Sequence, residues 1–556
     1  MIARRVVVLA VVALLAAGAL AQKKGTDGFH RLSPAAFAAM QDIRPQNIST
    51  QDRFLSSDLL EGRGTGQRGG DVAAEYIATQ FALYGLKPAG DNGTYMQKVP
   101  LVGVTPAPDT TFALVPDKGA PMELKALDEY VAYDETQQPE SNIDAPIVYV
   151  GYGIEAPEYN WDDYKGVDVK GKVLLMLVNQ PTDDPKLFHG KALTYYGRWT
   201  YKYEEAARKG AAGAILIHQT DMASYGWDVV RNSNSGEHSF LKADGAPQLK
   251  AASWISRDVA KKLAAASGKN LDKMMAEARS RDFHPVALPV RLKAHMVSKV
   301  RPFTSQNVVA MLPGSDARLK NEAVIYTAHY DHFGIRPDMK GDNIFNGAMD
   351  NGTGCSILLE LARVYSETKQ HPRRSILFAS VTGEEQGLLG SQYLGEHPPI
   401  PAGRISLDLN FDNILPLGSP EEVEVSGAER TNFFPALQET AKEFRFSIRP
   451  DPRPEAGYYY RSDHFSLARV GVPGFSVNQG IKFKGHDATW GLAQEDEYRD
   501  KHYHQPSDEW HPGLDWTSDA SIARFGFALG WEAANQSAEV QWKKGDEFER
   551  ARLASQ

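Results

Sequence analysis

The sequence contains one cysteine, Cys355, so no disulfide bond can form within the chain. This cysteine lies in the run GTGCSILLELA, where we expect a helix to begin, and we interpret it as a small buried residue. A dense run of lysine or arginine is also lacking, and the net charge is −9, so we expect no nucleic-acid partner. Internal repeats and low-complexity tracts are absent as well. With 42% hydrophobic and 24% charged residues over 556 positions, the composition is typical of a globular protein with more than one domain.

The only apolar run that approaches the length of a membrane span lies at the N-terminus. Arg4 and Arg5 precede the apolar residues 6–21, and this run ends in the small-x-small tripeptide ALA. This pattern predicts a secretory signal peptide at residues 1–21. The run is shorter than the ~20 residues that a spanning helix needs, and no cysteine follows it that could carry a lipid anchor. We therefore expect an exported protein, periplasmic or extracellular, with no membrane partner after cleavage.

The pattern of apolar residues changes twice along the rest of the chain. Residues 22–140 combine a helical run, DVAAEYIATQFALYGLKP, with strand-like fragments. Residues 141–295 alternate β-rich runs such as GKVLLMLVN with polar loops, which predicts a separate β-rich module of about 150 residues. Over residues 296–556, apolar strands alternate with helices. This alternation predicts an α/β domain with a mixed, mostly parallel sheet that helices cover.

Side chains with metal-binding chemistry follow three predicted strands of the C-terminal domain. His329 follows AVIYTA, Glu384 and Glu385 follow SILFASVTG, and Asp412 ends ISLDLNF. In open α/β sheets, ligands bind in the crevice beyond the carboxyl ends of the strands. We therefore expect these four side chains to gather at one edge of the sheet.

Histidine nitrogen and carboxylate oxygen are the ligands of hydrolytic zinc. Two zinc ions ~3.5–4 Å apart need roughly five protein ligands, one of them a bridging carboxylate. Asp350, at a glycine-rich helix start, is well placed to bridge, and Asp331 is suited to orient the imidazole of His329. A late histidine is still needed, and the C-terminal region offers His486, His502 and His504.

The adjacent pair Glu384 and Glu385 points to hydrolysis. Two neighbouring carboxylates cannot both face one metal, so one can bind the metal while the other acts as a general base toward water. Taken alone, such a pair is also typical of a solvated turn. The position after a buried strand and the other candidate ligands favour the hydrolytic interpretation.

The motifs AHYDH, MDNGTG, GEEQGLLGS, NFDN, RSDHF and YHQPSDE follow one another between about residue 300 and residue 540. This series resembles the co-catalytic zinc aminopeptidase family, the bacterial leucyl aminopeptidase type of metallopeptidase clan MH. Carboxypeptidase Q and the transferrin receptor share this fold. The resemblance implies a zinc-peptidase α/β/α sandwich built from residues 22–140 and 296–556. Residues 141–295 are similar to the protease-associated (PA) domain that many members carry as an insertion.

The resemblance also implies two zinc ions per chain and a role for each motif residue. Asp350 would bridge both ions, and Glu384 would be the general base. His329 and Asp412 would bind separate ions, with Glu385 on one ion and His504 on the other. Further roles would fall to Asp331 beside the ligand histidine, to Tyr503 at the reacting carbonyl oxygen, and to Arg461 and Asp463 in a substrate pocket.

One position departs from the family pattern. The family often has Asn-Asp-Asp or Ala-Asp-Asp at the bridge, whereas this chain has Met349-Asp350-Asn351. The bridging aspartate is kept, so the departure affects only its surroundings.

The expected activity is removal of N-terminal residues from peptides, with a metal-bridging water that Glu384 activates. Three alternatives remain open from the sequence. The first is a carboxypeptidase or dipeptidase on the same scaffold, for which Arg461 is the candidate partner of a substrate carboxylate. The second is a single-zinc glutaminyl cyclase. The third is a non-catalytic receptor-like ectodomain, which the complete ligand set disfavours. The sequence does not indicate the preferred substrate side chain, the physiological metal or the oligomeric state.

Overall fold

The computed structural model describes residues 29–223, 225–337 and 339–556. The predicted signal peptide lies outside these residues. The chain divides into two compact units. Unit 1 comprises the described part of Met1–Lys98 together with Gln306–Asp451 and Ser462–Gln556, and unit 2 comprises Val99–Ser305 and Pro452–Arg461. Among the described residues, no helix combines the length and the apolar character that a membrane span requires.

The unit boundaries differ from those expected at residues 22–140, 141–295 and 296–556. Unit 2 begins at Val99 because two early strands pair within it. β3 (Thr111–Pro116) pairs with β13 (Val286–Leu312), and β5 (Tyr130–Tyr133) pairs with β12 (Ala251–Ile255).

Unit 2 also includes the short segment Pro452–Arg461, which the sequence places in the C-terminal domain. The backbone N–H of Leu193 donates a 2.9 Å hydrogen bond to the carbonyl oxygen of Pro454. This contact joins residues far apart in the chain, so no local pattern could predict it.

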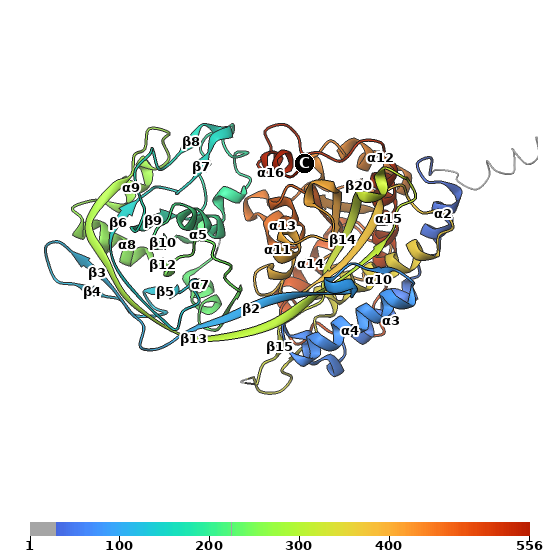
Figure 1. Cartoon of the computed structure of the whole chain (residues 1–556), viewed down its shortest axis with the longest axis horizontal. Coiled ribbons are helices and arrows are strands. Elements are labelled where there is room, and N and C mark those ends of the chain that lie inside the picture. Colours follow the sequence, from blue (N-terminus) through green and yellow to red (C-terminus); the bar gives the residue numbers. More distant parts are fainter. Residues whose placement is uncertain (1–28, 224, 338) are drawn as a thin grey trace, which may run out of the picture. The chain divides into compact units, whose positions relative to one another are not determined.

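The sheet of unit 1, of which β14 and β20 are labelled in Figure 1, is mixed and has a parallel centre. Its strands in spatial order are β1 (Lys87–Pro88), the end of β13, β17 (Ser375–Val381), β14 (Ala323–His329), β18 (Ile405–Asn410), β21 (Gly474–Gln479), β19 (Glu422–Ser426) and β20 (Ser447–Ile448). β14 is parallel to both β17 and β18, and β18 is parallel to β21. Every residue of β14, β17 and β18 is buried, which explains why these strands form continuous apolar runs in the sequence.

Helices cover both faces of this sheet, which confirms the predicted sandwich. Alternate strand residues enter different apolar clusters, for example Val324 and Tyr326 in one and Ile325 in the other. The larger cluster packs against α2 (Pro34–Gln41), α3 (Pro45–Leu55), α4 (Arg68–Leu83), α10 (Thr353–Glu367), α12 (Phe434–Phe444) and α15 (Thr517–Asn535). The smaller one packs against α11 (Leu389–Glu396) and α13 (His464–Arg469). The remaining helices of unit 1 are α14 (Ala488–Lys501) and α16 (Glu549–Ser555).

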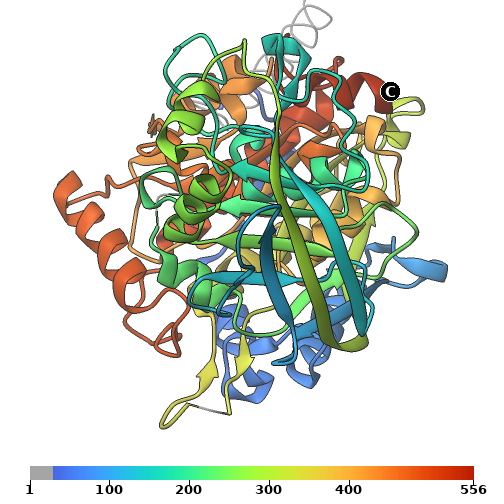
Figure 2. The ribbon, with the colours of Figure 1, turned by 90° about the vertical axis from the view of Figure 1, so that its left-hand side faces the viewer.

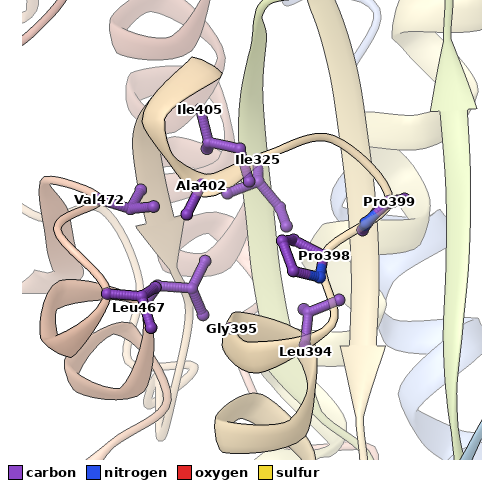
Figure 3. A pocket seen from close by; sticks show the side chains of 10 residues that line it. Ile325, Leu394, Gly395, Pro398, Pro399, Ala402, Ile405, Leu467 and Val472 are labelled. Atoms are coloured by element: carbon purple, nitrogen blue, oxygen red, sulfur yellow. The ribbon is translucent and has the colours of Figure 1, made fainter. Parts of the chain in front are cut away.

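A narrow crevice lies beneath α11 and α13, where Leu394, Ile405 and Leu467 converge (Figure 3). All its walls are aliphatic side chains, prolines or a glycine. The crevice therefore belongs to the packing of this face and offers no group for chemistry.

Unit 2 has its own sheet with a parallel centre. β6 (Glu140–Tyr149), β9 (Val173–Leu177), β10 (Gly213–Ile217) and β12 run parallel in that order, and β5 is antiparallel at the edge. The long β13 pairs antiparallel with β3 and β6 (Figure 2). The helices of unit 2 are α5 (Trp199–Arg208), α6 (Thr220–Ala223), α7 (Trp227–Ser233), α8 (Arg257–Ala266) and α9 (Leu271–Glu277). The unit is thus α/β, with more helix than the β-rich pattern predicts.

Candidate metal centre

The strand-end residues gather as the sequence predicts. His329 is the last residue of β14, and it lies beside Val381, the last residue of β17, in the parallel ladder. Glu384 and Glu385 follow β17, and Asp412 follows β18 on the other side of β14. Because the three strands are parallel neighbours, their carboxyl ends bring these side chains to one edge of the sheet.

The first candidate metal group contains His329, Asp350 and Asp412. The Nε2 atom of His329 lies 3.3 Å from Asp350 Oδ1 and 3.3 Å from Asp412 Oδ1. The other ring nitrogen, Nδ1, lies 3.1 Å from the carbonyl oxygen of Asp331. A histidine whose second nitrogen is held by a backbone carbonyl is typical of a metal ligand, because this contact fixes the ring.

The second candidate metal group contains His332, Asp350 and Glu385, and His504 lies next to its two carboxylates. His504 Nε2 lies 3.2 Å from Asp350 Oδ2 and 3.4 Å from Glu385 Oε2. His332 is buried, and its Nδ1 lies 2.6 Å from Glu385 Oε1. Either imidazole can therefore complete this group, but only His504 contacts both of its carboxylates at these distances.

The predicted division of the ligands between the two ions is wrong. His329 and Asp412 were expected on separate ions, but they lie together in the first group, while Glu385 and His504 lie together near the other oxygen of Asp350. The spacing of motifs along the chain orders the ligands without showing which of them meet in space. The prediction that Asp350 lies between the two sets agrees with its contacts on both sides.

Asp331 supports the centre through more than its carbonyl group. Its carboxylate accepts hydrogen bonds from Thr65 Oγ1 at 2.8 Å and from the backbone N–H of Glu384 at 3.2 Å. Asp331 thus connects the end of β14 to the loop that carries Glu384. The carbonyl oxygen of Asp331, rather than its carboxylate, orients the ring of His329. The nearest carboxylate oxygen of Asp331 is 3.9 Å from this ring.

Glu384 lies beside the first group without being part of it. Its Oε2 is 4.0 Å from His329 Nε2, and its side chain is 12% exposed. Burial raises the pKa of Glu384 well above the usual range, and the nearby His329 opposes this shift. A partly accessible carboxylate with a raised pKa is suited to accept a proton.

The centre holds more negative groups than the protein alone neutralises. Burial raises the pKa of Glu385 well above its usual range, with a further contribution from Asp350. Burial lowers the pKa of His329, but the carboxylates of Glu384 and Asp412 outweigh this effect and raise it overall. Without a cation, these buried carboxylates must hold protons. Carboxylate oxygens together with imidazole nitrogens form a donor set that fits zinc.

A hydrogen bond network that the sequence does not reveal positions Asp350. The carboxylate of Asp508 accepts from the backbone N–H groups of Met349 at 3.0 Å and Asp350 at 3.1 Å. Burial raises the pKa of Asp508 to about 6. Asp508 belongs to the YHQPSDE motif, but its partners lie more than 150 residues away, so only its place in that motif could have singled it out.

The departure at Asn351 has a structural explanation. Its Nδ2 donates to the carbonyl oxygen of Phe411 at 2.9 Å, and its Oδ1 accepts from the N–H of Gly354 at 2.9 Å. The side chain therefore acts as donor and acceptor at once, and an ionised aspartate could not donate.

A second buried residue, Arg63, was also missed by the sequence analysis. Its guanidinium donates to four backbone carbonyls, those of Leu55, Tyr330, Asn346 and Gly347. Tyr330 and Gly347 lie next to the segments that carry His329 and Asp350, so Arg63 ties the two segments together.

The remaining predicted residues lie as follows. The exposed ring of Tyr503 stacks on His504 with a centroid distance of 3.7 Å. Asp463 is buried, and burial raises its pKa to about 7. Its neighbour Ser462 donates to Asp412 Oδ2 at 2.5 Å. Arg461 belongs to unit 2, and the structure does not group it with the metal residues.

Comparison with known proteins identifies the segment that carries this centre. Residues 307–529 match the model of peptidase family M28, which is less than half of the chain. All five candidate ligands implied by the motifs, from His329 to His504, lie within the matched residues.

Two curated relatives and one solved structure illustrate the similarity. A probable zinc metalloprotease of Pyrenophora teres f. teres (strain 0-1) is 38% identical over 95 residues, covering 17% of this chain and 19% of the relative. Leupeptin-inactivating enzyme 1 of Streptomyces exfoliatus is 27% identical over 256 residues, covering 44% and 52%. An aminopeptidase structure from Aneurinibacillus sp. strain AM-1 is 19% identical with a TM-score of 0.48, covering 91% of this chain and 97% of that one. The matched segments span from about a fifth to about half of the curated relatives' length.

Proposed function

We propose that this chain is an exported, zinc-dependent aminopeptidase of the M28 type, which removes N-terminal residues from peptides. The observation that carries the proposal is the pair of candidate metal groups that share Asp350, with the carboxylate of Glu384 beside them. The M28 match over the same residues supports a peptidase. The relatives named as zinc metalloproteases support the choice of metal.

Five residues would hold two zinc ions. His329 and Asp412 would bind one ion, His504 and Glu385 the other, and Asp350 both. When bound, zinc supplies Lewis-acid polarisation of a carbonyl group and lowers the pKa of water.

Glu384 would take a proton from the attacking water and deliver it to the leaving amine. Its position outside both ligand groups leaves its carboxylate free for this transfer, and burial makes the carboxylate a stronger base toward water. Asp331 would hold the backbone of Glu384 and the ring of His329 in place. Tyr503, exposed beside His504, would donate a hydrogen bond from its hydroxyl group to the carbonyl oxygen of the substrate and so help to hold it.

Export and the identity of unit 2 belong to the same proposal. The basic and apolar pattern of residues 1–21 supports export, and sequencing of the mature protein should give Gln22 as its first residue. The resemblance of residues 141–295 to a PA domain supports the assignment of unit 2 as a PA-like insertion. Unchanged peptide hydrolysis after deletion of Val99–Ser305 would show that this insertion is dispensable for catalysis.

A digest of a mixed peptide library, followed by mass spectrometry, tests the activity. The library contains each peptide with a free and with an acetylated N-terminus. The digest is run once with and once without a metal chelator. The proposal predicts loss of single N-terminal residues from free peptides only, and no loss with the chelator. Trimming from the C-terminus would instead identify a carboxypeptidase, formation of pyroglutamate a cyclase, and an unchanged library a non-catalytic protein.

A further inference from the structure

Unit 2 contains a pocket whose walls carry two arginine side chains, Arg198 and Arg461. The pocket is small and opens to solvent. Arg198 precedes α5, and Arg461 ends the segment Pro452–Arg461. Trp199 and Tyr225 supply aromatic walls. All residues that line the pocket belong to unit 2, so it is complete within that unit.

Arg198 has no partner for its charge in the part of the chain that the structure describes. Its Nε–H group is buried and donates no hydrogen bond, and none of the observed ion pairs involves this residue. Burial lowers the pKa of Arg198 to about 10, and the charge of Arg461 adds to this shift. Arg461 is exposed to water, so the cost of an unpaired charge falls on the buried guanidinium of Arg198, and an anion would offset it.

Arg461 is also without an acidic partner among the described residues. It donates a 2.9 Å hydrogen bond to the carbonyl oxygen of Ala456 and lies 5.1 Å from the ring centroid of Tyr458. These contacts hold the side chain without neutralising it. Glu455 is the one acidic residue of the pocket wall, but it is exposed and forms no ion pair with either arginine.

The start of α5 adds to the positive potential of the pocket. Arg198 is the N-cap of this ten-residue helix, and no side chain accepts hydrogen bonds from the first turn. The first N–H groups of a helix lack partners within the helix, and the helix dipole places a partial positive charge there. The pocket therefore combines three positive elements with one exposed carboxylate.

We propose that this pocket binds the carboxylate group of a peptide C-terminus between Arg198 and Arg461. The planar guanidinium of arginine matches a carboxylate with two parallel hydrogen bonds. The apolar walls, which include Leu193, Trp199 and Met222, suit the organic remainder of a peptide better than they suit an inorganic ion. Burial raises the pKa of Tyr225, and the charges of both arginines oppose this shift. Both charges therefore act on the same wall of the pocket. The site uses none of the metal ligands and does not depend on the hydrolytic chemistry.

Calorimetric titration of the full-length, zinc-loaded mature protein tests this site. The probes are N-acetyl-leucyl-glycine, its C-terminal amide and inorganic phosphate at constant ionic strength. The acetyl group blocks the N-terminus, so an aminopeptidase does not consume the probe. The charged hydrogen bonds should make the acid bind about 10- to 100-fold more tightly than the amide.

Variants separate this pocket from the metal centre. Arg198→Met and Arg461→Met should each remove the preference for the acid, whereas Arg231→Met, an exposed arginine outside the pocket, should keep it. Unchanged thermal unfolding of the variants confirms that they fold. An acid preference that survives in both pocket variants would place the carboxylate elsewhere, for instance at zinc, and overturn the proposal. Equal binding of acid and amide would overturn it too, and phosphate binding as tight as that of the acid would refute the assignment to a peptide.

Discussion

Replacement of Glu384 by glutamine tests the role of the general base. The amide has nearly the shape of the carboxylate but cannot accept the proton of water. Because Glu384 lies outside both metal groups and its backbone N–H contact with Asp331 does not depend on the side chain, fold and metal binding should be unchanged. The sole expected change is therefore in the proton transfer.

A positioned general base contributes about 10²- to 10⁴-fold to the rate. This range corresponds to about 3–5 kcal/mol in the activation free energy. We expect kcat for an amino-acid p-nitroanilide to fall by at least about 10²-fold, with KM and zinc content unchanged.

The assay compares kcat, KM and zinc content of the wild type, Glu384→Gln and a control, Glu75→Gln. Glu75 is an exposed glutamate on α4 of the same unit, so its replacement should leave all three quantities unchanged. Full activity of Glu384→Gln would refute the assignment. Loss of zinc in this variant would show that Glu384 is a ligand rather than the base.

Three further replacements test the surroundings of the centre. Asp508→Asn should weaken zinc binding about 10- to 100-fold, because an amide cannot accept from both Met349 and Asp350 through two oxygens; competition with a chelator measures the change. Arg63→Met leaves four buried carbonyls without a donor, so it should lower the free energy of unfolding by at least about 3 kcal/mol. Urea titration measures this change, and a change below about 1 kcal/mol would contradict the account. His504→Ala should leave one zinc ion per chain whereas His332→Gln should keep two, and the reverse result would make His332 the ligand.

The sequence predicted the elements that depend on local pattern. The buried strands β14, β17 and β18 are continuous apolar runs, so their ends, and the ligands that follow them, can be located without a structure. The helical spacing in DVAAEYIATQFALYGLKP likewise predicted α4, and the helix expected to begin in GTGCSILLELA is α10.

What the sequence could not predict depends on contacts between distant residues. The pairing of His329 with Asp412 is set by the neighbouring ends of β14 and β18, and that of His504 with Glu385 by the turn after α14, which lies next to the loop after β17. The start of unit 2 at Val99 depends on strand pairs such as β3 with β13, which are separated by more than 150 residues. Arg63 and Asp508 act through backbone groups, which carry no sequence signal.

The measurement that tests the central claim most directly is the zinc content of the purified wild type and of Asp350→Ala. The shared position of Asp350 predicts two zinc ions per chain in the wild type, and loss of both with loss of peptidase activity in the variant. Mass spectrometry of the acid-digested protein gives the metal content, and circular dichroism confirms that the variant folds. A folded Asp350→Ala variant that keeps two zinc ions and its activity would contradict the account.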